Sequence, residues 1–445
     1  MDMDSSTKTT FSSKAGLILA AAGSAVGLGN IWKFPYIAGE NGGGAFLIVY
    51  LICVLLFGMP LIMTEFLIGK RSGKSVYGAF RELNGNNRWN WLSWLCMCTA
   101  MLIMGFYFVV TGWCFSYLAE AIVNVFSGMD MKALTDHFGV VVADTPRMIV
   151  FCLLPILLTA GVLWFDVNKG IERLSKILMP LLLVMMILMA GRVLMLDGSN
   201  IGMQFFFQMD FSKITPKVIM EAMGQCFFSL SIGMGALITY GAYMPKTQNV
   251  TATSAQVIIL DTLVAVLAGI IIFPAVFAFG FNPAEGPQLV FVVLPAIFEK
   301  MSFAWFSSVL FFALLCIAAV TSTISLMEVT VAFLCEATAD TKHPLNRRKS
   351  VLVTSVLIAV LVVLCILFNN LFDAFDEITS CILMPIGALG MSIFVGWCLP
   401  KGDKKGVLSD VKGIKRWPRK VFIFALRFIV PIAILIIFLN SLGII

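Results

Sequence analysis

Two carboxylates lie inside segments of the sequence that are otherwise apolar. Asp261 lies in VIILDTLVAVLAG, and Glu65 lies in PLIMTEFLIGK. A carboxylate within a membrane is costly and indicates a functional site by default. For Asp261 the alternative is a helix end that faces water. For Glu65, which is nearer to the end of its segment, a structural or water-facing role is an equal alternative.

Hydroxyl and amide side chains in similar surroundings could share a cation with such a carboxylate. The candidates that carry these oxygens are Asn30, Ser229, Ser231, Asp261, Thr321 and Ser322. Thr321 and Ser322 belong to CIAAVTSTISLMEVT, where the hydroxyls also fit a hydrogen-bonded seam between helices or a bond to the preceding turn. Tyr107, Phe228 and Met234, each taken alone, are typical of packing residues.

Glycines interrupt two of the apolar segments, at Gly27-Leu28-Gly29 and at Gly233-Met234-Gly235. Glycine weakens a helix interior, and a broken helix exposes N–H groups on one half and carbonyls on the other. Those groups attract a carboxylate and a hard cation, respectively. Interrupted helices at matching positions of two inverted halves predict a transporter site at the middle of the membrane. Two glycine pairs that serve only close helix packing are the alternative.

The elements that must position these residues are transmembrane helices. Of the 445 residues, 60% are hydrophobic and 13% are charged, and the mean hydropathy is +0.96. Apolar runs of roughly 20 residues can each cross a hydrocarbon core about 30 Å thick. The segment 282–300 is too polar and rich in proline to span, and it predicts an outer loop with short helical pieces. The eleven predicted spans are 15–38, 44–69, 90–126, 147–164, 174–195, 218–243, 254–281, 304–336, 350–369, 377–399 and 420–440.

Basic residues indicate how these spans are oriented. With a cytoplasmic N-terminus, 23 lysines and arginines fall in cytoplasmic segments and six in outer loops. This bias predicts a cytoplasmic N-terminus and, with an odd number of spans, an outer C-terminus. The net charge of +6 therefore reports orientation rather than nucleic-acid binding. The short loops and tails, without a glycosylation acceptor in the outer loops, favour a bacterial inner membrane.

Few residues are available for enzyme chemistry. The eleven cysteines lie mostly in apolar segments, and the two histidines, His137 and His343, lie in loops. A nucleophile–base set or a metal cluster is therefore not expected. An ion channel and a substrate sensor remain alternatives. However, no repeated selectivity-filter segment appears, and the short termini hold no output domain.

The motif GSAVGLGNIWKFPYIAGENGGGAF resembles the first-helix signature of the neurotransmitter:sodium symporter family, especially its bacterial amino-acid transporters. The motifs SLSIGMGALITYGAYM, EGPQLVFVVLPAIFEKM and VTSTISLMEV support the resemblance independently. It implies one all-α transporter domain over 1–445, with a first five-helix repeat at 15–195, an inverted repeat at 218–399 and an eleventh helix at 420–440. It also implies sodium-coupled uptake of an amino acid by alternating access, without an obligate protein partner.

The resemblance also implies two sodium sites and a substrate site. The first sodium ligands would be Ala25, Asn30, Ser229 and Asp261. The second sodium ligands would be Gly23, Val26, Ala318, Thr321 and Ser322. The substrate contacts would be Ala25, Gly27, Leu28, Gly29, Ile103, Tyr107, Phe228, Ser229, Ser231, Met234, Ser322 and Leu326.

Substitutions within the family pattern narrow the expected substrate. Gly27 replaces the aspartate of amine-transporting relatives, so the ligand must bring its own carboxylate. Met234 is flexible and can adapt to a large ligand. We therefore expect a large hydrophobic or aromatic amino acid, with small neutral amino acids as the alternative. Asp261 replaces the asparagine of chloride-dependent relatives, and Ala265 lacks their serine, so we expect chloride-independent transport.

Gates are implied on both sides of the site. Lys33 and Asp376 would form the outer ion pair. The inner gate would contain Lys8, Phe11, Tyr243 and Glu336.

Overall fold

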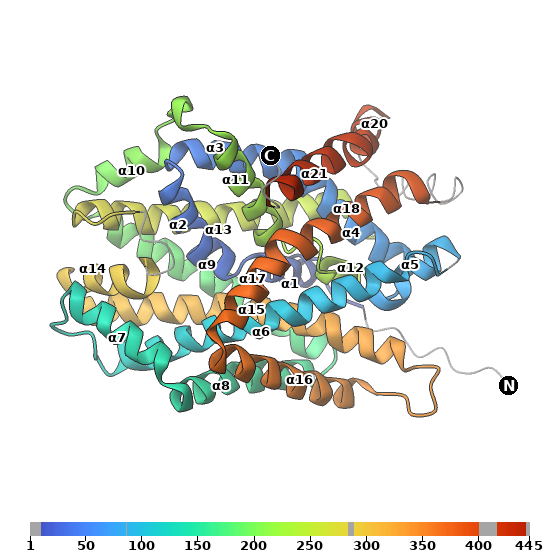
Figure 1. Ribbon diagram of the computed structural model, residues 1–445, viewed down its shortest axis with the longest axis horizontal. Helices are drawn as coiled ribbons and strands as arrows, with labels where there is room; N and C mark the ends of the chain where they lie inside the picture. The colour runs from blue at the N-terminus through green and yellow to red at the C-terminus, as the bar shows by residue number, and fades with distance from the viewer. Residues whose placement is uncertain (1–9, 86, 284–288, 400–415, 442–445) are drawn as a thin grey trace.

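Every regular element of the described chain is a helix, which confirms the predicted all-α class. The computed structural model describes residues 10–85, 87–283, 289–399 and 416–441. The predicted inner-gate residue Lys8 lies outside these ranges. Most of the long helices run along the long axis of the molecule (Figure 1). We call the end with α5 and α20 the inner end, and the end with α7, α10 and α14 the outer end.

The α-helices differ widely in length, and short π-helical turns join several of them. In chain order the α-helices are α1 (Lys14–Ala25), α2 (Phe34–Glu40), α3 (Gly44–Cys53), α4 (Met59–Ser72), α5 (Val76–Asn84), α6 (Asn90–Ile122), α7 (Met131–Ala143), α8 (Thr145–Leu163), α9 (Arg173–Leu194), α10 (Ser199–Phe207), α11 (Pro216–Ser229), α12 (Ala236–Ala242), α13 (Val250–Ala278), α14 (Leu294–Lys300), α15 (Ala304–Ala337), α16 (Arg347–Leu367), α17 (Asn369–Glu377), α18 (Met384–Ile393), α20 (Arg416–Phe424) and α21 (Val430–Ser441). The π-helical turns are Gly29–Lys33, Val54–Gly58, Asn168–Glu172, Leu289–Val293, Ile378–Leu383, Phe394–Cys398 and Ala425–Ile429.

Eight helical segments of the described chain are long and apolar enough to cross a membrane. They are Gly44–Ser72, Asn90–Ile122, Thr145–Leu163, Asn168–Leu194, Val250–Ala278, Ala304–Ala337, Arg347–Leu367 and Asn370–Cys398. The bent pair α1 and Gly29–Glu40 gives a ninth if it counts as one span. The predicted spans 218–243 and 420–440 consist of shorter helical pieces, so the count of eleven stays a prediction.

Both helix breaks predicted from the glycines are present. The axes of α1 and Gly29–Glu40 differ by 49°, and Val26 between them has an extended backbone. Between α11 and α12, Gly233 and Gly235 have φ angles of +91° and +78°, a region that glycine enters without steric cost. Ser231 has a φ of +53° in the same stretch, a conformation that costs a side-chain-bearing residue about 1–3 kcal/mol.

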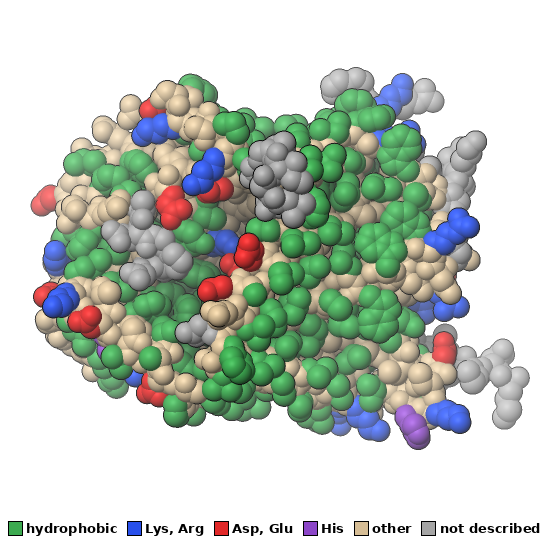
Figure 2. Space-filling model, viewed as in Figure 1, with side chains coloured by type: hydrophobic (Ala, Val, Ile, Leu, Met, Phe, Trp, Pro, Cys, Tyr) green, Lys and Arg blue, Asp and Glu red, His purple; other side chains and the backbone are tan. Residues whose placement is uncertain are grey.

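The surface of the molecule between its inner and outer ends is largely hydrophobic. Figure 2 shows hydrophobic side chains over the centre of the molecule and most of the charges towards its two ends. Leu55 and Leu157 are 68% and 67% exposed, respectively, which suits contact with lipid rather than water. The fold is that of a multi-pass membrane protein, and a set of polar residues that includes Asn30, Glu65 and Asp261 is buried inside the bundle.

Candidate functional site

A small cavity lies between the two helix breaks. Its walls come from the regions of both breaks and from α6 and α15, and they consist of Ser24, Ala25, Gly27, Gly29, Ile103, Tyr107, Phe228, Ser231, Met234, Ser322 and Leu326. Ten of the twelve residues predicted to contact the substrate are among them. The other two adjoin the wall, because Leu28 is bonded to Tyr107 and Ser229 follows Phe228. Ser24 was not predicted, since its sequence neighbourhood does not distinguish it from a packing residue.

The cavity has a volume of about 20 Å³. A space of this size holds about one water molecule. A Cβ atom at Gly27 would collide with the hydroxyl of Ser322 and lie 2.8 Å from that of Tyr107. A Cβ atom at Gly29 would lie 3.0 Å from the ring of Phe228. The glycines therefore keep the cavity open, and the side chains around it must move before an amino acid can enter.

Backbone groups of the first break are directed at side chains of other helices. The N–H of Leu28 donates to the hydroxyl of Tyr107 at 3.1 Å. The hydroxyl of Ser231 donates to the carbonyl of Ser24 at 2.9 Å, which joins the second break to the first. These polar groups are close to an apolar wall formed by Ile103 and others. This combination can orient the charged end of a small molecule and enclose its apolar part.

A buried oxygen cluster adjoins the cavity at Asn30, Ser229 and Asp261. The Nδ2 of Asn30 donates to Oδ1 of Asp261 at 2.8 Å and to Oγ of Ser229 at 3.0 Å. The hydroxyl of Ser229 lies 3.0 Å from both carboxylate oxygens of Asp261, and that of Tyr50 lies 3.3 Å from Oδ2. Asp261 is 0% exposed, so the alternative of a helix end that faces water does not apply.

A second oxygen cluster joins α1 to α15. The hydroxyl of Thr321 donates to the carbonyl of Ala318 at 2.9 Å, and that of Ser322 donates to the carbonyl of Val26 at 3.3 Å. A Cβ atom at Gly23 would lie 3.4 Å from that of Thr321. The five residues predicted for the second sodium site therefore converge on one place.

Both clusters offer the donors that a hard cation prefers. Within the described ranges, no three His, Cys, Asp or Glu side chains come together as they do at a transition-metal site. The clusters consist instead of carbonyl and hydroxyl oxygens, with one carboxylate at Asp261. Asn30 presents its amide nitrogen to Asp261, and its Oδ1 accepts from the N–H of Gly27 at 3.2 Å. Oxygen donors with little net charge suit sodium.

Glu65 stabilises the second break. Its Oε1 accepts a hydrogen bond from the N–H of Gly233 at 2.8 Å, and its side chain is 0% exposed. Of the two roles left open for Glu65, the structural one matches these contacts. Gln225 links the breaks in another way, because its Nε2 donates to the carbonyl of Gly29 at 2.7 Å.

The predicted outer pair is formed above the cavity. Nζ of Lys33 lies 3.4 Å from Oδ1 of Asp376 and 4.4 Å from the ring centroid of Phe228. The side chain of Lys33 is 15% exposed and that of Asp376 is 38% exposed. The pair is thus partly screened by water, and Lys33 also contacts a wall residue of the cavity.

At the inner end, three of the four predicted gate residues are described. The ring of Phe11 packs on Tyr243 with centroids 6.4 Å apart, and its N–H donates to the carbonyl of Tyr243 at 3.0 Å. Glu336 accepts a hydrogen bond from the N–H of Ser75 at 2.8 Å. The hydroxyl of Tyr243 donates at 2.8 Å to a different acid on α15, Glu328.

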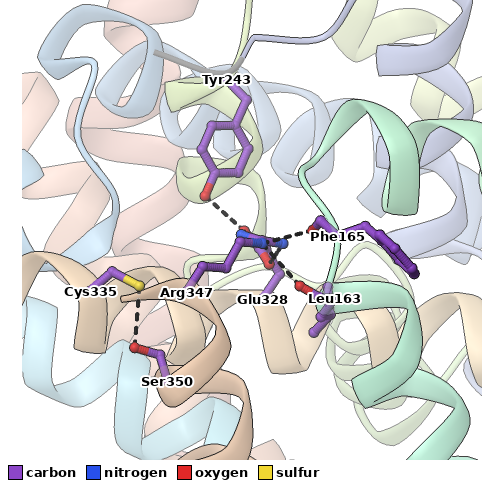
Figure 3. A network of polar contacts seen from close by, with 7 residues as sticks. All are labelled: Leu163, Phe165, Tyr243, Glu328, Cys335, Arg347 and Ser350. Atoms are coloured by element: carbon purple, nitrogen blue, oxygen red, sulfur yellow. Dashed lines mark hydrogen bonds and ion pairs between the residues drawn. The ribbon is translucent and has the colours of Figure 1, made fainter. Parts of the chain in front are cut away.

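Glu328 belongs to a buried ion pair that the sequence analysis missed (Figure 3). The two terminal guanidinium nitrogens of Arg347 each lie 2.8 Å from a carboxylate oxygen of Glu328, which is 0% exposed. Nε of Arg347 also donates to the carbonyls of Leu163 and Phe165 at the end of α8. The sequence does contain an indication of this pair, because Glu328 lies in the apolar motif ISLMEVT and Arg347 begins the next helix.

Comparisons with known proteins find similar sequences and a similar structure along nearly the whole chain. The sequence profile described as the sodium:neurotransmitter symporter family matches residues 8–134 and 128–444. YhdH, a sodium-dependent transporter of Bacillus subtilis, is 36% identical over 440 residues, which are 98% of this chain and 98% of YhdH. A sodium-dependent transporter of Haemophilus influenzae is 35% identical over 467 residues, which cover 99% of this chain and 100% of the relative. The crystal structure of MhsT in complex with L-phenylalanine matches with a TM-score of 0.89 and 38% identity, over 97% of this chain and 99% of MhsT.

Proposed function

Because this chain belongs to the sodium:neurotransmitter symporter family, whose members carry out sodium-dependent transport, we propose that it imports a large hydrophobic or aromatic amino acid together with sodium. Transport proceeds by alternating access, in which the cavity opens in turn to the outer and inner ends. The protein then lies in a bacterial inner membrane with its inner end in the cytoplasm. The two five-helix repeats and the eleventh helix belong to the same proposal.

The observation that carries this proposal is the contact of two buried oxygen clusters with one cavity at the helix breaks. Each cluster holds one sodium ion, and Ala25 and Ser322 serve both a sodium site and the substrate site. The substrate carboxylate lies near Leu28, Gly29 and Tyr107, where the break leaves N–H groups without helical partners. Sodium and substrate therefore support each other's binding.

The apolar wall supports the proposed substrate class. Ile103, Met234 and Leu326 face the cavity, and a methionine side chain can adapt its shape to the ligand. Gly27 offers no carboxylate to an amine. The similar protein MhsT is known in complex with L-phenylalanine, which favours a ligand of that size.

Chloride independence follows from Asp261 in this proposal. Its fixed negative charge is buried beside Tyr50 and Ser229, so an additional anion there would be repelled. Uptake should therefore continue when gluconate replaces chloride at constant sodium. A loss of uptake under these conditions would contradict this part of the proposal.

Uptake of radiolabelled amino acids into proteoliposomes tests the proposal directly. We expect saturable uptake with an inward sodium gradient and little uptake without it. Competition by the twenty common amino acids should be strongest for the large hydrophobic and aromatic ones. Strongest competition by glycine or alanine would overturn the substrate class. A large ohmic conductance would indicate a channel, and binding without uptake would indicate a sensor.

A further inference from the structure

The inner end of α1 is bonded to a carboxylate from another helix. Glu172 ends the π-helical turn Asn168–Glu172 before α9 and is 1% exposed. Its Oε2 accepts from the N–H of Ser12 at 2.7 Å, and its Oε1 accepts from the hydroxyls of Ser12 and Ser13 at 2.7 and 2.8 Å. Lys176, one turn further along α9, donates to Oε1 at 2.7 Å. Three of these four donors belong to Ser12 and Ser13, which directly precede α1.

The fit between Glu172 and α1 is close. Ser13 is the N-cap of α1, and its hydroxyl oxygen also accepts from the N–H of Gly16 at 3.0 Å. A Cβ atom at Gly16 would overlap the side chain of Glu172. The carboxylate therefore lies against the first turn of the helix, where the helix dipole favours a negative charge.

The position of α1 depends on such contacts because the helix is short and ends at a break. It contains 12 residues, and the extended backbone of Val26 interrupts its hydrogen bonding to the rest of the first span. Ala25, at its last turn, lines the central cavity. A displacement of its inner end would rotate α1 about the break and open a path from the cavity to the inner end.

We propose that Glu172 is a positioning residue that holds α1 in the inward-closed position. The proposal rests on the proposed function, since an inward opening is a step of alternating access. Release of Ser12 and Ser13 from Glu172 then precedes the movement of α1. Lys176 donates to the carboxylate of Glu172 and does not take part in the bonds between Glu172 and Ser12 or Ser13.

Hydrogen–deuterium exchange of the full-length protein in lipid nanodiscs tests this without measuring transport. In Glu172→Ala the amides of α1 should exchange at least about tenfold faster, the effect of losing hydrogen bonds to a charged group. Lys176→Met should leave the exchange of α1 as in the wild type, because the three bonds to Ser12 and Ser13 remain. Exchange in α16 should be unchanged in both variants and so excludes general unfolding.

A double-mutant cycle shows whether Ser12 acts through Glu172. Ser12→Ala should accelerate the exchange of α1 in the wild type but add nothing in Glu172→Ala. A full additional effect in Glu172→Ala would overturn the proposal. If Glu172→Ala does not fold, Glu172→Gln, which keeps an acceptor for the N–H of Ser12, should show the same pattern at smaller size.

A sodium titration of the same exchange separates this proposal from the proposed function. Sodium should slow the exchange of α1 in the wild type, and Glu172→Ala should need more sodium for the same protection. If sodium protects α1 equally in both proteins, the positioning role of Glu172 is wrong while sodium binding stands. If Glu172→Ala accelerates the exchange of α1 but sodium does not change this exchange in either protein, the proposal of sodium binding is wrong while the positioning role of Glu172 stands.

Discussion

Asn30 donates from its Nδ2 to Oδ1 of Asp261 at 2.8 Å, although 231 residues separate the two in the chain. Asn30 lies directly after the first break, and Asp261 lies inside the long helix α13. The amide supplies partial positive charge to a carboxylate that is cut off from water. A sodium ion bound here would take over that role, because its full charge interacts more strongly with the carboxylate in a buried site.

Asp261→Asn should therefore weaken sodium binding. Loss of the only carboxylate in the cluster should raise the sodium concentration for half-maximal substrate binding at least about tenfold, which corresponds to about 1.4 kcal/mol. Substrate binding titrated with sodium, at constant ionic strength, measures this shift. An unchanged midpoint would exclude Asp261 as a sodium ligand.

Gly27→Ala should reduce substrate affinity at least about tenfold, because the added Cβ forces the hydroxyls of Ser322 and Tyr107 out of the cavity wall. Gly224→Ala is the matched control. Gly224 lies in the other interrupted span, in α11, and a Cβ there meets no atom within 4 Å. The control should bind substrate normally, and stability should rise by roughly 0.5–1 kcal/mol, because alanine favours a helix. Equal binding by both variants would argue against a site at the first break.

Lys33→Gln should accelerate the release of bound substrate to the outside. The effect should be up to about fivefold, since an ion pair this exposed contributes at most about 1 kcal/mol. Lys33→Arg should slow the release, because a guanidinium can bind the carboxylate of Asp376 with two hydrogen bonds. Dissociation of radiolabelled ligand gives both rates. Lys213→Gln, which removes the exposed pair with Asp210, should have no effect.

Glu328→Gln should destabilise the inner end by about 3 kcal/mol, because it leaves the largely buried guanidinium of Arg347, whose side chain is 22% exposed, without a full counter-charge. The double variant Glu328→Leu/Arg347→Met should recover part of this loss, since an apolar pair of similar size avoids the buried charge. Thermal unfolding in detergent compares the three proteins. A double variant that is less stable than Glu328→Gln would show that Arg347 acts chiefly through the carbonyls of Leu163 and Phe165.

The sequence predicted what depends on local pattern. The apolar windows predicted the helices, and the glycines at 27–29 and 233–235 predicted the breaks, because a weak helix interior is a property of the segment itself. The partner of Tyr243 is different. Glu328 and Glu336 lie about two turns apart on α15, and only the packing of α12, α15 and α16 decides which of them lies within reach of the hydroxyl. The same limit applies to Ser24, whose place in the cavity wall depends on the angle between the two halves of the first span.

Tyr243 makes hydrogen bonds through both its backbone and its side chain. Its carbonyl accepts from the N–H of Phe11, and its hydroxyl donates to Glu328. The segment before α1 and the Glu328–Arg347 ion pair are therefore both connected to Tyr243, at the end of α12. A movement of Tyr243 would strain both hydrogen bonds, so we expect them to weaken together. The inner end should thus open cooperatively, in one step that breaks both contacts, and not through independent steps.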